Sequence, residues 1–222
     1  MTLIEARDVS KVYKGESEVK ALDKVTFQVN EGEFVAIMGP SGSGKSTLLS
    51  ILGVLNPPTS GELIIDEIKV FELSNEKQAD FRREYLGFVF QQFQLIPYLT
   101  ALENVMLPLA VSKMSKQKKR AAAESVLEKV GLGNKFHRLP HQLSGGEQGR
   151  VAVARAIVNE PLIILADEPT GSLDTKTGLE IIELFRELNK AGHTILMVTH
   201  NTENLQHVNR TIFIRDGRID NN

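Results

Sequence analysis

The chain has 222 residues, a formal net charge of −2 at pH 7 and no cysteine. A chain of this length can bury a sizeable core in one domain with an inserted subdomain, while the lack of cysteine excludes disulfides, zinc-thiolate sites and thiol redox chemistry. A net charge this small gives no global attraction to nucleic acid, so we expect no nucleic-acid partner.

A glycine-rich segment joins a predicted strand to a predicted helix. Residues 33–38 have the apolar, branched pattern of a buried strand, and residues 47–52 predict a helix. The segment reads Gly39, Pro40, Ser41, Gly42, Ser43, Gly44, Lys45, Ser46 and Thr47. Its glycines let successive backbone N–H groups point inward, and the helix N-terminus favours anions, so this context predicts a phosphate loop rather than a chance serine-glycine linker.

The phosphate loop carries two side chains with expected chemistry. We expect Lys45 to reach the outer phosphates of a nucleotide, and the Ser46 hydroxyl to bind Mg²⁺. After this loop, residues 56–61 predict a turn, and residues 62–65 and 86–90 predict strands within a strand-rich first ninety residues.

From about residue 92 to residue 158 the pattern is mainly helical. One predicted helix runs from about Lys116 to Val130, with Val126, Leu127 and Val130 on its apolar side. A run of basic residues with no acid between them comprises Lys113, Lys116, Lys118, Lys119 and Arg120. We interpret this run as the solvated start of the helix, with contacts to membrane headgroups or nucleic acid as the alternative.

A second glycine-rich helix start follows. Ser144 and Glu147 have the spacing of a capping box, and the apolar pattern from Val151 onward continues a helix. Gly145 and Gly146 leave the backbone bare where an anion can approach, although an ordinary capped helix has the same pattern. Since one nucleotide needs only one phosphate loop, a second cradle makes sense if it closes over a nucleotide held by another copy.

Residues 162–166 predict a second buried strand, which ends in two acids. Ligands of α/β folds bind at this edge of the sheet. We expect Asp167 to bind Mg²⁺ there through water, and Glu168 to polarise a water that attacks the γ-phosphate. A solvated turn is the alternative for the two acids taken alone.

The last part of the chain alternates between strand and helix patterns. Residues 175–190 predict an amphipathic helix with Gly192 just past its end; its apolar positions are Leu179, Ile182, Phe185 and Leu188. Residues 194–199 predict a strand, and residues 215–218 predict a hairpin turn. No apolar run approaches the ~20 residues of a membrane span, and residues 1–8 do not resemble a signal peptide, so we expect a cytoplasmic chain.

These motifs, in this order, resemble the ATPase subunit of ABC transporters over essentially the whole chain. The resemblance implies an α/β P-loop NTPase fold with a RecA-like core, an antiparallel β subdomain and an inserted α-helical subdomain. It implies one nucleotide-binding domain over residues 1–222, with the helical subdomain at approximately 92–158. ATP and Mg²⁺ are the implied ligands, and ATP hydrolysis coupled to transport is the implied reaction.

The resemblance also gives single residues expected roles. Tyr13 matches the aromatic that stacks on adenine, Gln91 the glutamine that senses Mg²⁺ and the membrane partner, and His200 the histidine that contacts the γ-phosphate. The signature motif that contacts ATP across a dimer matches Ser144, Gly145, Gly146 and Gln148, and the D-loop aspartate matches Asp174. The implied catalytic set is Glu168, His200 and Gln91, and the implied metal set is Ser46, Gln91 and Asp167. Taken alone, each residue has a plainer alternative. Tyr13 also fits a core-edge aromatic, Gln91 a strand-end amide and His200 a loop histidine. Asp174 also fits a helix N-cap.

Residues 88–105 and 165–171 resemble the MacB, LolD and FtsE branch of the family. That branch implies a membrane subunit with four transmembrane helices and an extracytoplasmic domain, with a periplasmic or extracellular adaptor as a further partner. It also implies a peripheral position on the inner face of the cell membrane. Two head-to-tail copies would enclose two ATP molecules, each between Lys45 of one copy and Ser144 of the other.

Two positions depart from the family pattern. Gly149 stands where glutamine is usual, at a helix-propensity cost of about 1 kcal/mol relative to alanine, and Asn201 stands where aspartate is common.

Two other functions are alternatives to a transporter ATPase. The first is a soluble ABC ATPase acting on nucleic acid or the ribosome, and the second is a small-molecule kinase with the same phosphate loop. The transported substrate and its direction stay open, because specificity lies in the partner.

Overall fold

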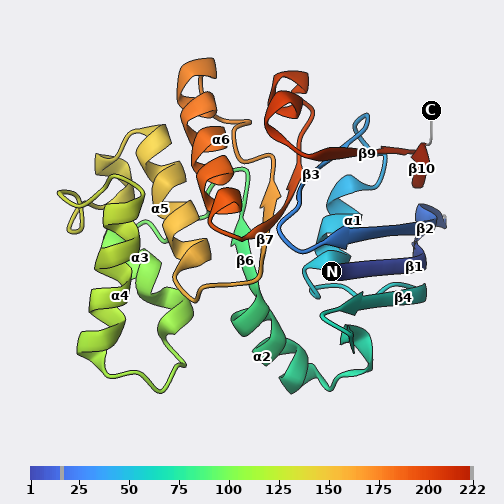
Figure 1. The fold of residues 1–222 in the computed structure, drawn as a ribbon, viewed down its shortest axis with the longest axis horizontal. Helices are drawn as coiled ribbons and strands as arrows, with labels where there is room; N and C mark the ends of the chain where they lie inside the picture. The colour runs from blue at the N-terminus through green and yellow to red at the C-terminus, as the bar shows by residue number, and fades with distance from the viewer. Residues whose placement is uncertain (16–17, 221–222) are drawn as a thin grey trace.

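The computed structural model describes residues 1–15 and 18–220, and it contains two β-sheets (Figure 1). The larger sheet has six strands in the order β10-β9-β3-β8-β7-β6, and the smaller has four in the order β2-β1-β4-β5. The larger sheet consists of β3 (Phe34–Met38), β6 (Leu86–Val89), β7 (Ile163–Asp167), β8 (Thr194–Val198), β9 (Arg210–Arg215) and β10 (Arg218–Asp220). The smaller consists of β1 (Thr2–Tyr13), β2 (Val19–Asn30), β4 (Ser60–Ile65) and β5 (Ile68–Lys69).

The two sheets differ in pairing because they differ in burial. Neighbouring strands of the larger sheet run parallel, except that β10 runs antiparallel to β9. Every residue of β3 and β8 is buried, as a parallel sheet covered on both faces requires. The smaller sheet is antiparallel, and β2 alternates between buried and exposed residues over much of its length, so one face of this sheet is open to solvent.

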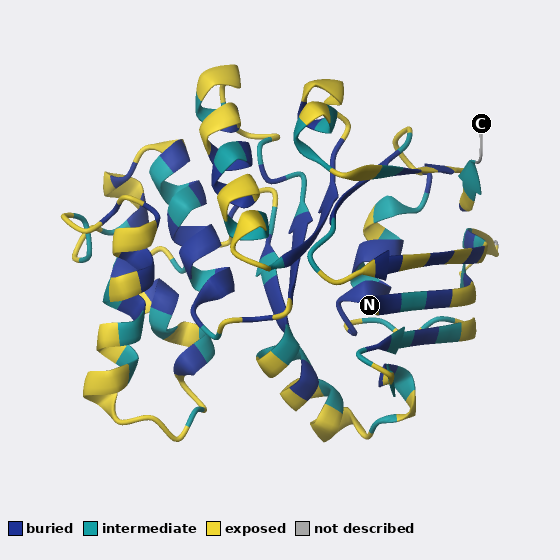
Figure 2. Cartoon of the chain, in the orientation of Figure 1, coloured by how far each residue is buried: buried dark blue, intermediate teal, exposed yellow. Residues whose placement is uncertain are grey.

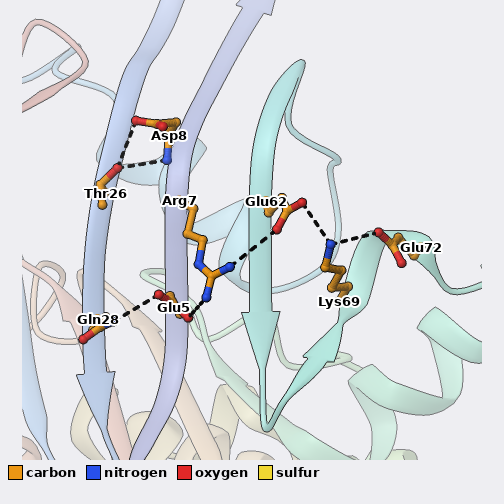
Figure 3. A network of polar contacts seen from close by, with 8 residues as sticks. All are labelled: Glu5, Arg7, Asp8, Thr26, Gln28, Glu62, Lys69 and Glu72. Carbon is orange, nitrogen blue, oxygen red and sulfur yellow. Dashed lines mark hydrogen bonds and ion pairs between the residues drawn. The ribbon is translucent and has the colours of Figure 1, made fainter.

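Polar side chains join the strands across the exposed face of the smaller sheet (Figure 3). Arg7 donates to Glu5 over 2.7 Å and lies 4.0 Å from Glu62, while Lys69 donates to Glu62 over 3.0 Å. The contact with Arg7 is the main reason why the pKa of Glu5 is lowered. These cross-strand pairs align β1 with β4 and β5, and they occupy a face that takes no part in the site described below.

Helices cover both faces of the larger sheet. They are α1 (Lys45–Leu52), α2 (Asn75–Tyr85), α3 (Ala101–Met106), α4 (Lys116–Lys129), α5 (Gly145–Ile157) and α6 (Thr175–Lys190). Four short 3₁₀ segments are η1 (Val70–Glu72), η2 (Leu107–Leu109), η3 (Pro140–Gln142) and η4 (Thr202–His207). Three helices, α3, α4 and α5, lie between β6 and β7 in the chain and form one side of the molecule, with their buried residues turned inward (Figures 1 and 2).

The larger sheet separates two apolar cores. Along β7, Ile163 and Leu165 belong to the core shared with α1 and the smaller sheet, whereas Ile164 and Ala166 belong to the core shared with α3, α4, α5 and α6. This alternation follows from the period of two along a strand. The helical region therefore shares its core with one face of the sheet, and its division from the rest as a subdomain at 92–158 stays a prediction. Across the described residues, no helix is both long and apolar enough to traverse a bilayer.

Most predicted elements are confirmed, with ends shifted by one or two residues. The strands expected at 33–38, 62–65, 86–90, 162–166 and 194–199 are β3, β4, β6, β7 and β8, and the expected helices include α1, α4, α5 and α6. The hairpin turn at 215–218 joins β9 to β10, with Asp216 at φ 49° and Gly217 at φ 75°. Positive φ at both central residues is the geometry that a tight hairpin turn requires.

Two expectations were wrong. The prediction of a strand-rich first ninety residues missed α2. Its buried residue is Phe81, on which the partly buried Tyr85 stacks, and most of its other residues are polar, so its apolar stripe is short. Its N-cap Ser74, which accepts from the backbone N–H of Lys77, was the available signal. The second error is Leu179, which is 41% exposed, because the buried stripe of α6 includes Gly178 instead.

Candidate active site

The phosphate loop is the turn from β3 into α1, and close backbone packing explains its glycines. Gly39 has φ 152° and Gly44 has φ 104°, conformations that L side chains rarely adopt. A Cβ at Gly39 would overlap the carbonyl oxygen of Ile214, and one at Gly44 would overlap that of Ala21. Gly42 has open space around it, but its φ of 78° also favours glycine. The loop therefore keeps a bare backbone at the start of α1.

Lys45 lies folded back over this loop. Its Nζ donates to the carbonyl oxygens of Gly39 and Pro40, each over 2.8 Å. Ser43 is buried, and its Oγ has no hydrogen-bond partner among the described residues. A buried hydroxyl without a partner beside a glycine-rich turn is suited to an anionic oxygen supplied by a ligand. The loop therefore fits a bound phosphate chain.

Two carboxylates stand opposite the loop at the end of β7. Burial raises the pKa of Asp167, the negative charge of Glu168 raises it further, and the positive charge of Lys45 opposes both. Because the charge of Lys45 lowers the pKa of Asp167, the phosphate loop and the end of β7 are close enough to interact electrostatically. A carboxylate with a raised pKa gains most from a cation placed beside it.

Glu168 and His200 make a direct contact. Oε2 of Glu168 lies 2.8 Å from Nδ1 of His200, and the Glu168 side chain is largely buried whereas that of His200 is exposed. The backbone of Glu168 has φ 46°, a left-handed conformation for a residue with a side chain, and its N–H donates to the carbonyl of Val198. Such strain persists where the surroundings fix a residue in place, as at many functional sites.

One cleft of ≈ 470 Å³ collects these groups. It is lined by Val19, Lys20, Ala21, Gly39, Ser41, Gly42, Ser43, Gly44, Lys45, Ser46, Thr47, Gln91, Asp167, Glu168, Val198 and His200. Pro40 contributes its carbonyl to Lys45 from the same loop. The volume is within the usual range for small-molecule sites. The predicted metal set of Ser46, Gln91 and Asp167 lies within this lining, and its oxygen donors are those that Mg²⁺ prefers, so the residues present fit that ion.

Gln91 is held by the segment that follows β7. Its carbonyl accepts from the hydroxyl of Ser172 over 3.2 Å, and a Cβ on Gly171 would lie 3.1 Å from its Nε2. After Gln91 the chain makes a strained turn, with Phe93 at φ 57° and Gln94 at φ 46°. Gln91 is therefore packed against the segment that follows the cleft residues Asp167 and Glu168.

Arg155 fixes that strained turn, and the sequence pattern gave no sign of this contact. Its guanidinium donates to the carbonyl of Phe93 over 2.6 Å and to that of Gln94 over 2.7 Å. Burial lowers the pKa of Arg155. From the sequence, Arg155 was only one more residue of the helix predicted after Ser144. Its contacts join residues 61 and 62 positions apart, and no local pattern indicates them.

The second glycine-rich helix start is a capping box, as predicted. The Ser144 hydroxyl accepts from the Glu147 N–H over 3.3 Å, and the Glu147 carboxylate accepts from the Ser144 N–H over 2.9 Å and pairs with Lys135. A Cβ at Gly146 would overlap the methyl of Thr177, and one at Gly145 would lie 3.1 Å from Leu173. These glycines therefore also allow the start of α5 to pack closely on the start of α6.

The remaining predicted residues lie outside the lining of the cleft. Asp174 caps α6, accepting from the N–H of Thr177 over 3.1 Å, and Gln148 donates to the carbonyl of Leu143. Within the described part of the chain, that lining includes neither of them, nor Ser144, Gly145 or Gly146. Tyr13 is also outside the lining, although its strand partner Val19 is part of it.

The two departures from the family pattern have structural settings. Gly149 is buried in α5, and a Cβ there would lie 3.2 Å from the ring of Phe93 and 3.3 Å from Ile181. Asn201 caps η4 by accepting from the N–H of Glu203 over 2.9 Å. Neither residue lines the cleft.

Comparisons with known proteins find relatives that match nearly the whole chain. The profile of the family described as ABC transporter matches residues 22–171. An uncharacterized ABC transporter ATP-binding protein of Thermotoga maritima is 52% identical over 219 residues, which cover 98% of this chain and 94% of that protein. The macrolide export ATP-binding/permease protein MacB of Aggregatibacter actinomycetemcomitans is 45% identical over 220 residues, which cover 99% of this chain but 34% of MacB.

Two solved structures are also similar. The ATP-binding cassette MJ0796 of Methanocaldococcus jannaschii, solved as a dimer in a post-hydrolysis state with ADP and Pi, has a TM-score of 0.90 at 47% identity. The match covers 98% of this chain and 97% of that one. CbiO1 of Clostridium perfringens, part of the complex cbiONQ, has a TM-score of 0.89 at 27% identity and covers 99% and 87% of the two chains.

Proposed function

The chain belongs to the ABC transporter family, and from this premise we propose that it is the ATP-hydrolysing subunit of a transporter, acting as a dimer on a separate membrane subunit. One observation carries the proposal. The cleft joins the phosphate loop to Asp167, Glu168 and His200, while Ser144 and its glycines lie outside the cleft lining. A complete site then needs a second copy, as the dimeric relative with ADP and Pi suggests.

The phosphate loop binds the nucleotide in this proposal. Lys45 leaves the carbonyls of Gly39 and Pro40 and moves to the outer phosphates, while the N–H groups at the start of α1 bind the inner ones. Ser46, Asp167 and Gln91 would hold Mg²⁺, which neutralises phosphate charge when bound. Binding of the ion by Asp167 relieves the unfavourable burial that raises its pKa.

Hydrolysis depends on the contact between Glu168 and His200. Glu168 orients a water molecule for attack on the γ-phosphate and polarises its O–H bond. His200 fixes the rotamer of Glu168 through Nδ1, 2.8 Å away, and its exposed ring is free to approach the γ-phosphate. Fixed groups of this kind act by positioning and by electrostatic stabilisation of the transition state.

A groove on another face suits the membrane partner. A cavity of ≈ 430 Å³ lies between α2 and the helices after β6, and its lining includes Leu55, Ala79, Phe88, Phe90, Pro108 and Gln94. Its boundary includes Arg155, which holds the turn after Gln91. A segment of the membrane subunit seated here would press on the turn that leads to Gln91, so that the helical region at 92–158 passes motion between the partner and the cleft.

The type of partner follows from the branch resemblance. The relative MacB combines an ATP-binding part with a permease, and this chain spans about a third of it. We propose a separate permease with four transmembrane helices and an extracytoplasmic domain, which holds this chain at the inner face of the membrane. Export or extraction of a substrate fits this branch better than import.

The test uses Glu168→Gln, which should bind ATP without rapid turnover. With ATP and Mg²⁺ the variant should form a dimer in light scattering, and the dimer should disappear when Ser144→Arg is added. A tagged Glu168→Gln protein should also retain a four-helix membrane protein from detergent-solubilised membranes. A monomer under all nucleotide conditions would contradict the dimer, and ATPase activity stimulated by nucleic acid would favour the soluble alternative.

A further inference from the structure

Tyr13 is partly exposed and pairs in the smaller sheet with a residue that lines the cleft. It ends β1, and its Cα partner on β2 is Val19, which lines the cleft. Paired residues of an antiparallel ladder project to the same face of the sheet. The Tyr13 residue is 41% exposed, so a planar group entering the cleft from this side can reach the ring.

Two other side chains contact this ring, Lys11 over one face and Asn56 at the hydroxyl. Nζ of Lys11 lies 5.3 Å from the ring centroid, within the range of a cation–π contact. The tip is held by Asn56, whose Nδ2 donates to the Tyr13 hydroxyl over 3.1 Å. Lys11 and Asn56 also contact each other, since the lysine donates to Oδ1 of the asparagine over 2.8 Å. The three side chains thus form a closed set of contacts.

This set is anchored to the end of the phosphate-loop helix. Asn56 lies in the turn after α1, and Lys11 donates to the next carbonyl, that of Pro57, over 2.6 Å. The backbone N–H of Val12 donates to the hydroxyl of Thr59 in the same turn over 3.0 Å. The helix that begins at Lys45 therefore ends next to the residues that hold Tyr13. Phosphate loop and aromatic ring are fixed relative to each other.

We propose that Lys11 and Asn56 are positioning residues for the base of the bound nucleotide. This inference rests on the proposed ATP site, with Tyr13 as the surface on which the base stacks. The ammonium group occupies one face of the ring and leaves the other for the base, and the hydrogen bond from Asn56 holds the tip of the ring in place. Because Lys11 and Asn56 already hold the ring in place, binding of the base has to order fewer side chains, and this preorganisation increases the affinity.

A plainer role for Lys11 predicts a different result. If Lys11 only secures the turn at Asn56 and Pro57, its loss would shift the end of α1 and weaken every ligand of the phosphate loop alike. If it positions the ring, its loss would weaken ligands that carry a base and spare those that carry phosphate alone. The difference between ATP and inorganic tripolyphosphate separates the two roles.

The experiment measures both affinities calorimetrically in the Glu168→Gln protein with Mg²⁺. We expect Lys11→Met and Asn56→Ala each to weaken ATP binding by about three- to tenfold, and to change tripolyphosphate binding by less than about twofold. Lys11→Arg keeps a cation over the ring and should retain most of the ATP affinity. Adding Lys11→Met to Tyr13→Ala should cause no further loss, because the ring it supports is gone.

Each outcome decides between the two proposals. Equal weakening of ATP and tripolyphosphate by Lys11→Met would overturn the positioning role, as would unchanged ATP binding in both Lys11→Met and Asn56→Ala. If Tyr13→Ala itself leaves ATP binding unchanged, stacking on Tyr13 fails together with this inference. The phosphate loop proposed above would still stand in that case, since tripolyphosphate binding reports on it alone.

Discussion

Nδ1 of His200 lies 2.8 Å from Oε2 of Glu168, so the catalytic carboxylate proposed here is oriented by a side chain from the end of the neighbouring strand. Glu168 directly follows β7 and His200 follows β8, and the two strands pair in parallel. Their contact is therefore a product of the sheet register. The positions of both residues depend on the same ladder that places Asp167 beside Val198.

Replacing Glu168 by glutamine should slow ATP hydrolysis by about 100- to 10,000-fold while leaving ATP affinity nearly unchanged. The amide keeps the size of the side chain but cannot accept the proton of the attacking water. Phosphate release and nucleotide binding report the two effects. Glu187→Gln, at an exposed position of α6, is the matched control. Ordinary turnover in Glu168→Gln would show that another group activates the water.

Replacing Lys45 by alanine should weaken ATP binding by at least about tenfold, because a charge-assisted contact with the outer phosphates is lost. Equilibrium binding of a fluorescent ATP analogue measures the change. Lys190→Ala removes an exposed charge from the end of α6 and should have no effect. Unchanged affinity in Lys45→Ala would argue against the phosphate loop as the binding element.

Replacing Asp167 by asparagine should make the ligand-free protein more stable at pH 7 and abolish Mg²⁺-dependent hydrolysis. Burial, followed by the charge of Glu168, raises the pKa of Asp167, so its ionised form destabilises the fold. The penalty is absent below the unfolded pKa, near 3.8, grows as the pH rises from there to the raised folded pKa, and is fully present above it. Urea unfolding at pH 7 and at low pH should show a difference that shrinks on acidification. A less stable variant at pH 7 would contradict the assigned cause.

Replacing Arg155 by lysine should cost about 1–3 kcal/mol of unfolding free energy, since lysine lacks the planar fork whose two nitrogens each bind one of the carbonyls of Phe93 and Gln94. The strained turn after Gln91 would loosen, and stimulation of ATPase activity by the membrane subunit should fall more than basal activity. Arg186→Lys on the exposed face of α6 is the control. A fully stable and fully stimulated Arg155→Lys protein would remove the turn from the coupling route.

The phosphate loop, the capping box and the buried strands were predictable because spacing within a few residues encodes each of them. Gly39 and Gly44 need positive φ and leave no space for a Cβ, and the sequence displays both as glycines. Contacts between distant segments left no such pattern. Lys11 meets Asn56 across 45 positions, and Arg155 meets Gln94 across 61. A residue type alone does not indicate which remote carbonyl or amide it will meet.

The site itself was predictable residue by residue but not in its division. Asp167 and Glu168 could be predicted from the end of a buried strand, whereas Gln91 and His200 were implied only by the family resemblance; all four line one cleft in the structure. Asp174 had two readings, and its carboxylate accepts from Thr177 at the start of α6, as an N-cap does. The polar helix α2 escaped prediction because its burial depends mainly on Phe81.

The close packing of Gly146 on the methyl of Thr177 would link the two nucleotides of the proposed dimer. Each chain would give Glu168 to one nucleotide and the start of α5 to the other, and these two parts meet through the start of α6. A displacement of α5 on binding at one nucleotide is transmitted by contact to the segment that carries Glu168 at the second. If such coupling exists, occupancy of either position alters the affinity at the other by the same free energy, and the two nucleotides bind cooperatively.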